Sequence, residues 1–271
     1  MTDWPGRSLV VAILMCPLLV VLGGIAAWML RALAGSAPVD AEVAGRGRSA
    51  LLGQGLRQGF AWTLGPVERM FLAGRASPDA LTIAGTAMCG AGALVVAAGD
   101  LTVGGLLCLG SSAFDFLDGR IARRRGVASA AGEFLDSTLD RYADAFCFGA
   151  AAFLLRGEPL ALAASLAAFG AAGIVPYARA KAEALGVTSR SGLMQRPERM
   201  VLYSAAAIFS AALDPWVGRV LAGAHPTFAA AQVLLAAATV ATAVGRTREA
   251  RALLRGAAPG SGAPRHEDPT S

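Results

Sequence analysis

Residues 115–140 read DFLDGRIARRRGVASAAGEFLDSTLD and place four aspartates beside long apolar segments. Asp115 and Asp118 are three residues apart, and Asp136 and Asp140 are four residues apart. On helices, each spacing puts both carboxylates on one face. Four carboxylates at a membrane edge repel one another and are costly to desolvate, so the pattern favours a bound cation. Oxygen ligands without histidine or thiolate suit Mg²⁺ or Mn²⁺ better than zinc.

The chain around this stretch is predicted to cross a membrane several times. It has 271 residues, is 55% hydrophobic and carries a formal net charge of +5. Several apolar segments are long enough to span a bilayer. The arginines lie mostly between or after these segments, which fits anionic lipid headgroups better than nucleic acid. The four cysteines lie in apolar segments without C-x-x-C pairing, so only packing roles are expected, with neither disulfides nor metal thiolates.

The N-terminal quarter is predicted to hold two helices of its own. Residues 8–30 carry no charge and are expected to form a retained transmembrane helix, because they are long for a signal-peptide core and lack a clear cleavage site. Residues 31–48 are expected to be a linker. Residues 49–76 mix apolar and charged side chains, which is typical of an amphipathic helix in the membrane interface, with a plain surface helix as the alternative.

Six further membrane helices are expected over residues 77–256. Their predicted ranges are 77–98, 101–123, 130–155, 160–183, 198–213 and 227–244, the last continuing as a basic helix to residue 255. Ser77 followed by Pro78 is typical of a helix start. The many glycines and alanines predict close helix contacts. Residues 257–271 are expected to be a disordered tail.

The distribution of arginines predicts how the bundle is oriented. Loops at residues 120–125, 179–199 and 246–255 are strongly basic, whereas the turns between them are nearly neutral. The positive-inside rule places basic loops in the cytoplasm. The aspartates and the C-terminus of a multi-pass protein of the cytoplasmic membrane would then face the cytoplasm, with the N-terminus outside.

The aspartate stretch resembles the signature of the CDP-alcohol phosphotransferase family of membrane enzymes. That signature is D-x-x-D-G-x-x-A-R, eight residues, then G-x-x-x-D-x-x-x-D. Its fixed positions are matched by Asp115, Asp118, Gly119, Ala122, Arg123, Gly132, Asp136 and Asp140. The resemblance covers about residues 77–248. It implies an all-α integral membrane protein, a bundle of six transmembrane helices with the N-terminal transmembrane helix and the interfacial amphipathic helix as additions, and a homodimer.

The resemblance also implies a reaction and roles for the signature residues. The phosphatidyl group of CDP-diacylglycerol would pass to the hydroxyl of a polar alcohol, with release of CMP. Asp115, Asp118 and Asp136 would hold Mg²⁺ or Mn²⁺, expected as two ions, to neutralise the pyrophosphate. Asp140 would be the general base and would also touch one ion.

Contacts with the CDP-lipid are expected from a further set of positions. These are Asp118, Gly119, Ala122, Arg123, Gly132 and Thr82. The small residues would allow close approach, and Arg123 would hold a phosphate or the cytidine. Thr82 matches the S-P-N-x-L-T opening of the family's first core helix, in which Asp79 replaces the usual asparagine.

Three arginines are the candidates for binding the acceptor alcohol. Arg179, Arg196 and Arg199 would form an anion pocket for a phosphorylated acceptor, while a surface ion pair of Arg179 with Glu183 is the alternative. The pattern resembles the phosphatidylinositol-phosphate synthases, so inositol phosphate is the expected acceptor, with glycerol 3-phosphate or another alcohol as alternatives. An alternative from a different functional class is a membrane transporter or a pseudoenzyme, in which the aspartates would serve ion passage or structure.

Overall fold

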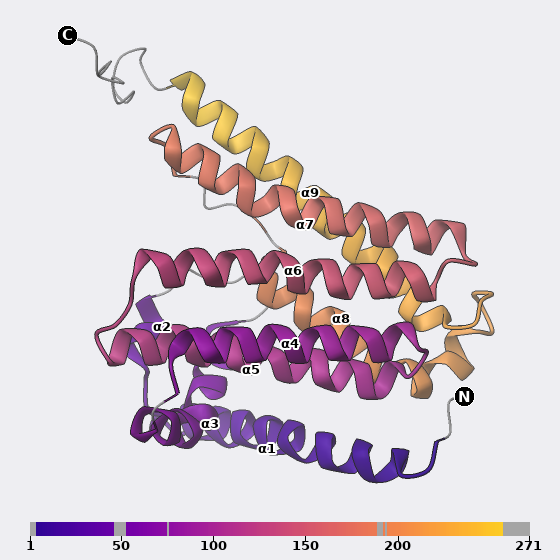
Figure 1. Cartoon of the computed structure of the whole chain (residues 1–271), viewed down its shortest axis with the longest axis horizontal. Coiled ribbons are helices and arrows are strands. Elements are labelled where there is room, and N and C mark those ends of the chain that lie inside the picture. Colours follow the sequence, from indigo (N-terminus) through magenta and orange to yellow (C-terminus); the bar gives the residue numbers. More distant parts are fainter. Residues whose placement is uncertain (1–3, 46–52, 75, 189–191, 193, 257–271) are drawn as a thin grey trace.

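The computed structural model describes residues 4–45, 53–74, 76–188, 192 and 194–256, so the predicted disordered tail lies outside the described residues. Its helices are α1 (Arg7–Leu33), α2 (Ala41–Gly45), α3 (Gln54–Ala73), α4 (Pro78–Ala97), α5 (Leu101–Arg124), α6 (Ala130–Leu154), α7 (Pro159–Ala184), α8 (Arg196–Val217) and α9 (Pro226–Gly256). Figure 1 shows α4, α5, α6 and α8 in the centre, α7 and α9 along one flank, and α1 and α3 along the other. The all-α prediction is confirmed.

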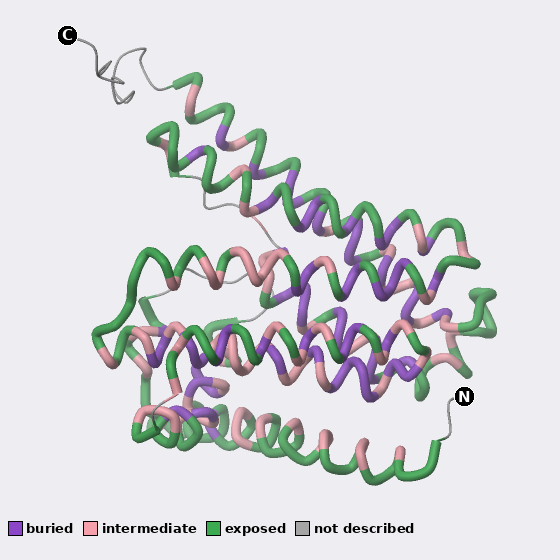
Figure 2. Tube along the Cα trace, in the orientation of Figure 1, coloured by how far each residue is buried: buried purple, intermediate pink, exposed green. Residues whose placement is uncertain are grey.

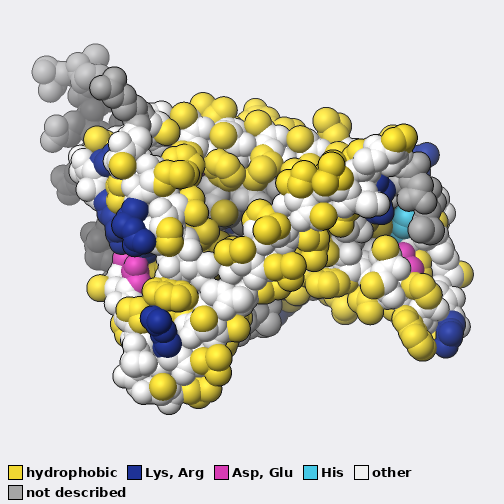
Figure 3. Space-filling view, turned by 90° about the horizontal axis from the view of Figure 1, so that it is seen from below, with side chains coloured by type: hydrophobic (Ala, Val, Ile, Leu, Met, Phe, Trp, Pro, Cys, Tyr) yellow, Lys and Arg dark blue, Asp and Glu magenta, His cyan; other side chains and the backbone are white. Residues whose placement is uncertain are grey.

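The long helices suit a membrane. Within the described residues, α1, α4, α5, α7, α8 and α9 are long and apolar enough to cross a bilayer. Helix α6 is as long, at 25 residues, but its N-terminal part, up to residue 144, carries Glu133, Asp136, Asp140, Arg141 and Asp144. It packs against α4 and α7, which completes the six-helix core α4–α9. Figure 3 shows hydrophobic side chains over the broad middle of one face and arginines or lysines toward its ends, as in a multi-pass membrane protein.

Side-chain caps start the helices that carry the aspartates. The Ser77 hydroxyl accepts a hydrogen bond from the Ala80 amide at 3.2 Å, and Pro78 opens α4. Asp100 and Ser129 cap α5 and α6 in the same way. Each cap satisfies an amide that lacks a partner within its helix. The starts of the central helices are therefore encoded locally.

Close packing fixes α5 against α4. A Cβ atom added to Gly92 would lie 2.8 Å from the carbonyl oxygen of Gly104, and one added to Gly104 would lie 2.6 Å from the carbonyl oxygen of Gly92. Only glycine fits at these two positions, and it lets the helix backbones approach closely. Figure 2 shows buried residues along the central helices and along α7 and α9, while α1 is mostly exposed.

The N-terminal helices lie beside this core. Helix α1 packs along α3, where a Cβ atom added to Gly59 would lie 3.1 Å from the Cα atom of Ile25. The segment predicted as a linker contains the short helix α2, which the sequence analysis missed. Asp40 caps it by accepting a hydrogen bond from the Val43 amide at 3.1 Å. A single turn carries too little periodicity to be predicted.

Helix α8 is longer than predicted. It continues through Pro215 to Val217, although the sequence indicated an end at residue 213. Asp214 accepts hydrogen bonds from the Ser210 hydroxyl and the Thr227 amide, both at 2.9 Å. These bonds tie the last turn of α8 to the start of α9, so the proline is accommodated near the helix end.

Candidate active site

Two of the four aspartates meet at one arginine. Asp115 comes from α5 and Asp140 from α6, and Arg196 occupies the first position of α8. The Nη1 atom of Arg196 lies 2.6 Å from Oδ2 of Asp115 and 2.8 Å from Oδ1 of Asp140. All three side chains are between 15 and 19% exposed, so the cluster is largely buried but still accessible. Arg196 was predicted to bind the acceptor, and the structure places it between two predicted metal ligands.

Asp118 is held by two other predicted site residues. The Thr82 hydroxyl, on α4, donates a buried hydrogen bond of 2.7 Å to Oδ2 of Asp118. The Gly119 amide donates to Oδ1 of the same carboxylate. These two donors fix the direction of the side chain, so Thr82 acts on the site through Asp118.

Asp136 completes the acidic group. It lies on the partly exposed face of α6, near enough to Asp118 and Asp115 for the like charges to repel. No three of these four carboxylates have oxygens that all lie within 4.8 Å of one another. Among the described residues, only a group of three cysteines has potential ligand atoms that close together. Within the described part of the chain, four carboxylates face only the guanidinium groups of Arg196 and Arg141, which leaves an excess of negative charge that hard divalent cations would neutralise.

The remaining signature residues surround this group. Arg123 extends from the end of α5 and pairs with Glu42 of α2 at 2.5 Å. A Cβ atom added to Gly119 would lie 3.1 Å from Nη1 of Arg123, so the arginine lies over the glycine backbone. The carbonyl of Ala122 accepts from the amide of residue 127 as α5 ends. Gly132 lies in the first turn of α6, beside Asp79 of α4.

Acidic residues that precede the signature bind Arg120, which occupies a variable position within it. Arg120 is 1% exposed, and its guanidinium lies 2.7 Å from Asp40 and 3.2 Å from Glu68 of α3. It also lies over the ring of Phe116, 5.2 Å from the centroid. The hydrogen bond from Arg120 holds the pKa of Asp40 below its usual range. This cluster was not predicted, because the sequence around Arg120 shows only a basic loop.

The three predicted acceptor arginines line one small pocket. Its volume is about 190 Å³, and its lining includes Arg141, Arg179, Arg196, Arg199 and Arg246. Five guanidinium groups line this small space, so an anion that enters it would meet several hydrogen-bond donors.

Four of these arginines also have acidic partners, and one of them, Arg141, lies 3.7 Å from Asp140. Arg199 is buried and pairs with Asp144 at 2.8 Å. Arg179 pairs with Glu183 at 2.8 Å, so the predicted surface ion pair is present although Arg179 also lines the pocket. Arg196 joins the pocket to the aspartates.

A family model decides the identity of the core. The model for CDP-alcohol phosphatidyltransferase matches residues 75–245. The chain belongs to the CDP-alcohol phosphatidyltransferase family. It is therefore a transferase enzyme, as the signature predicted, and the transporter and pseudoenzyme alternatives are not supported.

Similar proteins include phosphatidylinositol phosphate synthases and an archaetidylinositol phosphate synthase. The phosphatidylinositol phosphate synthase of Mycobacterium tuberculosis is 34% identical over 196 residues, which are 70% of this chain and 86% of the relative. That of Mycobacteroides abscessus is 35% identical over 158 residues, 57% of this chain and 72% of the relative. The archaetidylinositol phosphate synthase of Methanothermobacter thermautotrophicus is 35% identical over 138 residues, 51% of this chain and 69% of the relative.

Solved structures of the Mycobacterium tuberculosis phosphatidylinositol phosphate synthase PgsA1 share the fold. The complex with CDP-DAG has a TM-score of 0.59 and 30% identity, and covers 68% of this chain and 92% of that one. The complex with manganese and citrate has a TM-score of 0.60 and 29% identity, and covers 69% and 88%. The family's helical fold is thus confirmed for the core of this phosphatidyltransferase.

Proposed function

We propose that this phosphatidyltransferase is a phosphatidylinositol phosphate synthase. It transfers the phosphatidyl group of CDP-diacylglycerol to a hydroxyl of inositol phosphate and releases CMP. The observation that supports this choice is the pocket of five arginines that reaches the aspartates through Arg196. An uncharged alcohol would not require such a pocket, whereas a phosphate monoester carries between one and two negative charges at neutral pH and pairs well with guanidinium groups.

The four aspartates would hold divalent metal, two ions of Mg²⁺ or Mn²⁺. When bound, the metal offsets the negative charge of the pyrophosphate and of the departing CMP. The solved relative in complex with manganese supports a site for such an ion. Asp115 and Asp118 contribute from α5, and Asp136 and Asp140 from α6. Thr82 and the Gly119 amide keep the Asp118 carboxylate oriented while substrates exchange.

Asp140 is the general base of the proposed reaction. It lies at the junction of the acidic group and the arginine pocket, where an acceptor hydroxyl would arrive. Its carboxylate accepts the hydroxyl proton as the oxygen attacks the phosphorus of the CDP-lipid. The ion pair with Arg196 directs the Asp140 carboxylate toward the pocket. Catalysis then comes mostly from positioning and charge stabilisation.

The CDP-lipid is expected on the other side of the acidic group. Arg123 would pair with its phosphate or cytidine, and Gly119, Ala122 and Gly132 leave room for the nucleotide. We further propose that the site faces the cytoplasm, that two copies form a homodimer, and that the chain divides into residues 1–48, 49–76 and 77–256 as predicted, with α3 in the membrane interface.

An acceptor panel tests the proposal. Purified protein receives CDP-diacylglycerol and Mg²⁺ with radiolabelled inositol phosphate, glycerol 3-phosphate or free inositol, and both CMP and labelled lipid are measured. We expect lipid labelling from inositol phosphate and little from free inositol. Arg179→Gln should raise the KM for inositol phosphate by about tenfold, the value of one charged hydrogen bond, without changing the KM for the CDP-lipid. Labelling by glycerol 3-phosphate alone would replace this acceptor with the alternative one.

A further inference from the structure

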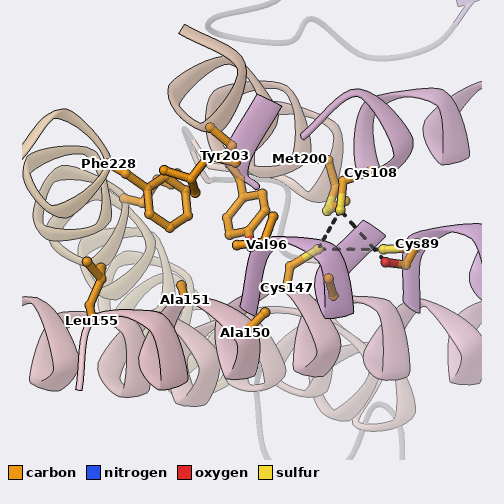
Figure 4. Packing of buried hydrophobic residues seen from close by; sticks show 14 of the residues in the cluster. Cys89, Val96, Cys108, Cys147, Ala150, Ala151, Leu155, Met200, Tyr203 and Phe228 are labelled. Atoms are coloured by element: carbon orange, nitrogen blue, oxygen red, sulfur yellow. Dashed lines mark hydrogen bonds between the residues drawn. The ribbon is translucent and has the colours of Figure 1, made fainter. Parts of the chain in front are cut away.

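Three buried thiols meet in the core of the bundle. Cys89 lies on α4, Cys108 on α5 and Cys147 on α6, and each is at most 1% exposed. The Sγ atoms of Cys89 and Cys147 are 3.5 Å apart, and those of Cys108 and Cys147 are 3.9 Å apart. All three sulfurs lie within 4.8 Å of one another. Figure 4 shows them pointing toward one another from three helices.

A thioether adjoins the thiols. Met200 of α8 belongs to the same core cluster and is 3% exposed. Figure 4 shows it beside Cys108. Four helices therefore direct four sulfur side chains into one dry region, a set we call the sulfur cluster: Cys89, Cys108, Cys147 and Met200.

The sulfur cluster lies deeper in the bundle than the aspartates. Cys108 precedes Asp115 by seven residues, Cys147 follows Asp140 by seven, and Cys89 follows Thr82 by seven. Seven residues are about two helical turns, so each cysteine shares a helix face with its partner about 10 Å away along the axis. The cluster is thus separate from the transferase site, although the same helices carry both.

Soft donors select soft metals. Thiolate and thioether ligands together favour Cu(I), whereas Mg²⁺ and Mn²⁺ prefer oxygen. Three sulfurs bound at about 2.3 Å in a trigonal plane lie about 4.0 Å apart, close to the sulfur separations seen here. We propose that the sulfur cluster binds one Cu(I) ion per chain.

Binding requires no electron transfer when copper is supplied as Cu(I). Each thiol that becomes a ligand forms a sulfur–copper bond and releases its proton to solvent, so the apparent affinity rises with pH. The region is already packed and apolar, so the ion would replace sulfur–sulfur contacts.

The test uses the full-length protein in detergent with Cu(I) kept reduced by ascorbate. Competition with the chromophoric chelator bicinchoninate gives stoichiometry and affinity, and we expect one ion per chain. Cys89→Ser, Cys108→Ser and Cys147→Ser should each weaken binding by more than about tenfold. Cys16→Ser removes the exposed cysteine of α1 and should leave affinity unchanged, which makes it the matched control. Met200→Leu keeps the side-chain volume and should weaken binding less than the cysteine variants.

The outcomes separate this proposal from the transferase function. Retained CMP release shows that a cysteine variant is folded, because these residues take no part in the proposed reaction. X-ray absorption at the copper edge should show a sulfur-only shell at about 2.3 Å. A shell of nitrogen or oxygen, binding lost in Cys16→Ser, no binding by the wild type, or wild-type affinity in folded cysteine variants would each overturn the site. If the serine variants do not fold, Met200→Leu and the absorption spectrum still decide.

Discussion

Arg196 shows how much of the site depends on single residues. It pairs with Asp115 and Asp140, which lie 81 and 56 positions away in the chain, and it lines the pocket proposed for the acceptor. The sequence identified each of these residues, because the signature and the basic loop are local patterns. It could not predict that one guanidinium joins them, since that contact depends on how α8 meets α5 and α6.

Asp140→Asn tests the proposed general base. The amide keeps the shape of the side chain but cannot accept the hydroxyl proton, so CMP release should fall by about 10²- to 10⁴-fold. The melting temperature in detergent should change little, because Arg196 keeps Asp115 as a partner. Full activity in a folded Asp140→Asn protein would assign the base elsewhere.

Glu42→Gln tests the ion pair on Arg123. The carboxylate of Glu42 forms an ion pair with Arg123, the residue expected to bind the CDP-lipid, so it competes with the substrate's phosphate. Because partly exposed ion pairs are worth at most about 1 kcal/mol, the KM for CDP-diacylglycerol should fall by up to about fivefold with kcat unchanged. Glu183→Gln, which frees Arg179 instead, is the matched control and should leave this KM unchanged. An unchanged KM in Glu42→Gln would exclude competition.

At the scale of helices, the range of α6 was predicted to within one residue, from Ala130 to residue 155 against the observed end at Leu154. Its Ser129 cap and its apolar second half are visible in the sequence. Helix α2 and the burial of Arg120 were not predicted. Both depend on acidic residues that contact α5 but lie more than 50 positions from Arg120 in the sequence, and such contacts leave no local sequence pattern.

Arg120→Met tests what holds the signature helix. The change leaves the buried Glu68 without its main partner, and breaking such a pair costs about 3–5 kcal/mol. The melting temperature should drop markedly. Arg124→Met removes a half-exposed partner of the same glutamate and should have a small effect. The double variant Arg120→Met with Glu68→Leu should recover part of the loss, and equal effects of the two arginine variants would contradict a special role for Arg120.

The packing of α2 against α5 should depend on pH. The folded pKa of Asp40 is lowered by Arg120, so this group contributes stability that is fully present above its unfolded pKa of about 3.9 and is lost as the pH falls through the lower folded value. Trp28 donates a hydrogen bond to the carbonyl of Pro38 at 2.9 Å, so its fluorescence reports this segment. Subtracting a Trp28→Phe protein isolates the signal. Asp40→Asn should remove the acid transition, and a transition that persists in it would have another origin.

Divalent metal should tie α5 to α6. Within the described chain these two helices make little direct contact and are joined mainly through α4. An ion held by aspartates of both helices would bridge them and stabilise the folded state by mass action. Treatment with EDTA should abolish CMP release and lower the melting temperature, and Mg²⁺ or Mn²⁺ should restore both. Asp136→Asn should lose the thermal response to Mg²⁺, and an unchanged response would remove Asp136 from the ligand set.

At the scale of the whole molecule, the chain is a family core with an N-terminal extension. The family model begins at residue 75, whereas Asp40, Glu42 and Glu68 precede it. The extension therefore supplies acidic partners to the signature helix from outside the matched region. The resemblance to the family predicted a core from about residue 77 with the first helix outside it, but the dependence of one on the other could not be predicted.

Two truncations test that dependence. A protein that begins at residue 36 loses α1 but keeps Asp40 and Glu42, and it should retain CMP release. A protein that begins at residue 53 also loses these acids, and its melting temperature should fall well below that of the first. Similar melting temperatures for the two proteins would show that α2 adds no support to the core.

The N-terminal extension contacts helix α5 at both ends of that helix. Arg7, at the start of α1, pairs with Asp100 before the first turn of α5 at 2.6 Å, while Asp40 and Glu42 pair with arginines near its last turn. Helix α1 is 27 residues long and so spans about 40 Å. A bilayer thinner than this makes a long hydrophobic helix tilt. Such a tilt would pull on α5 through both attachments, and the catalytic rate would then vary with the acyl-chain length of the surrounding lipids.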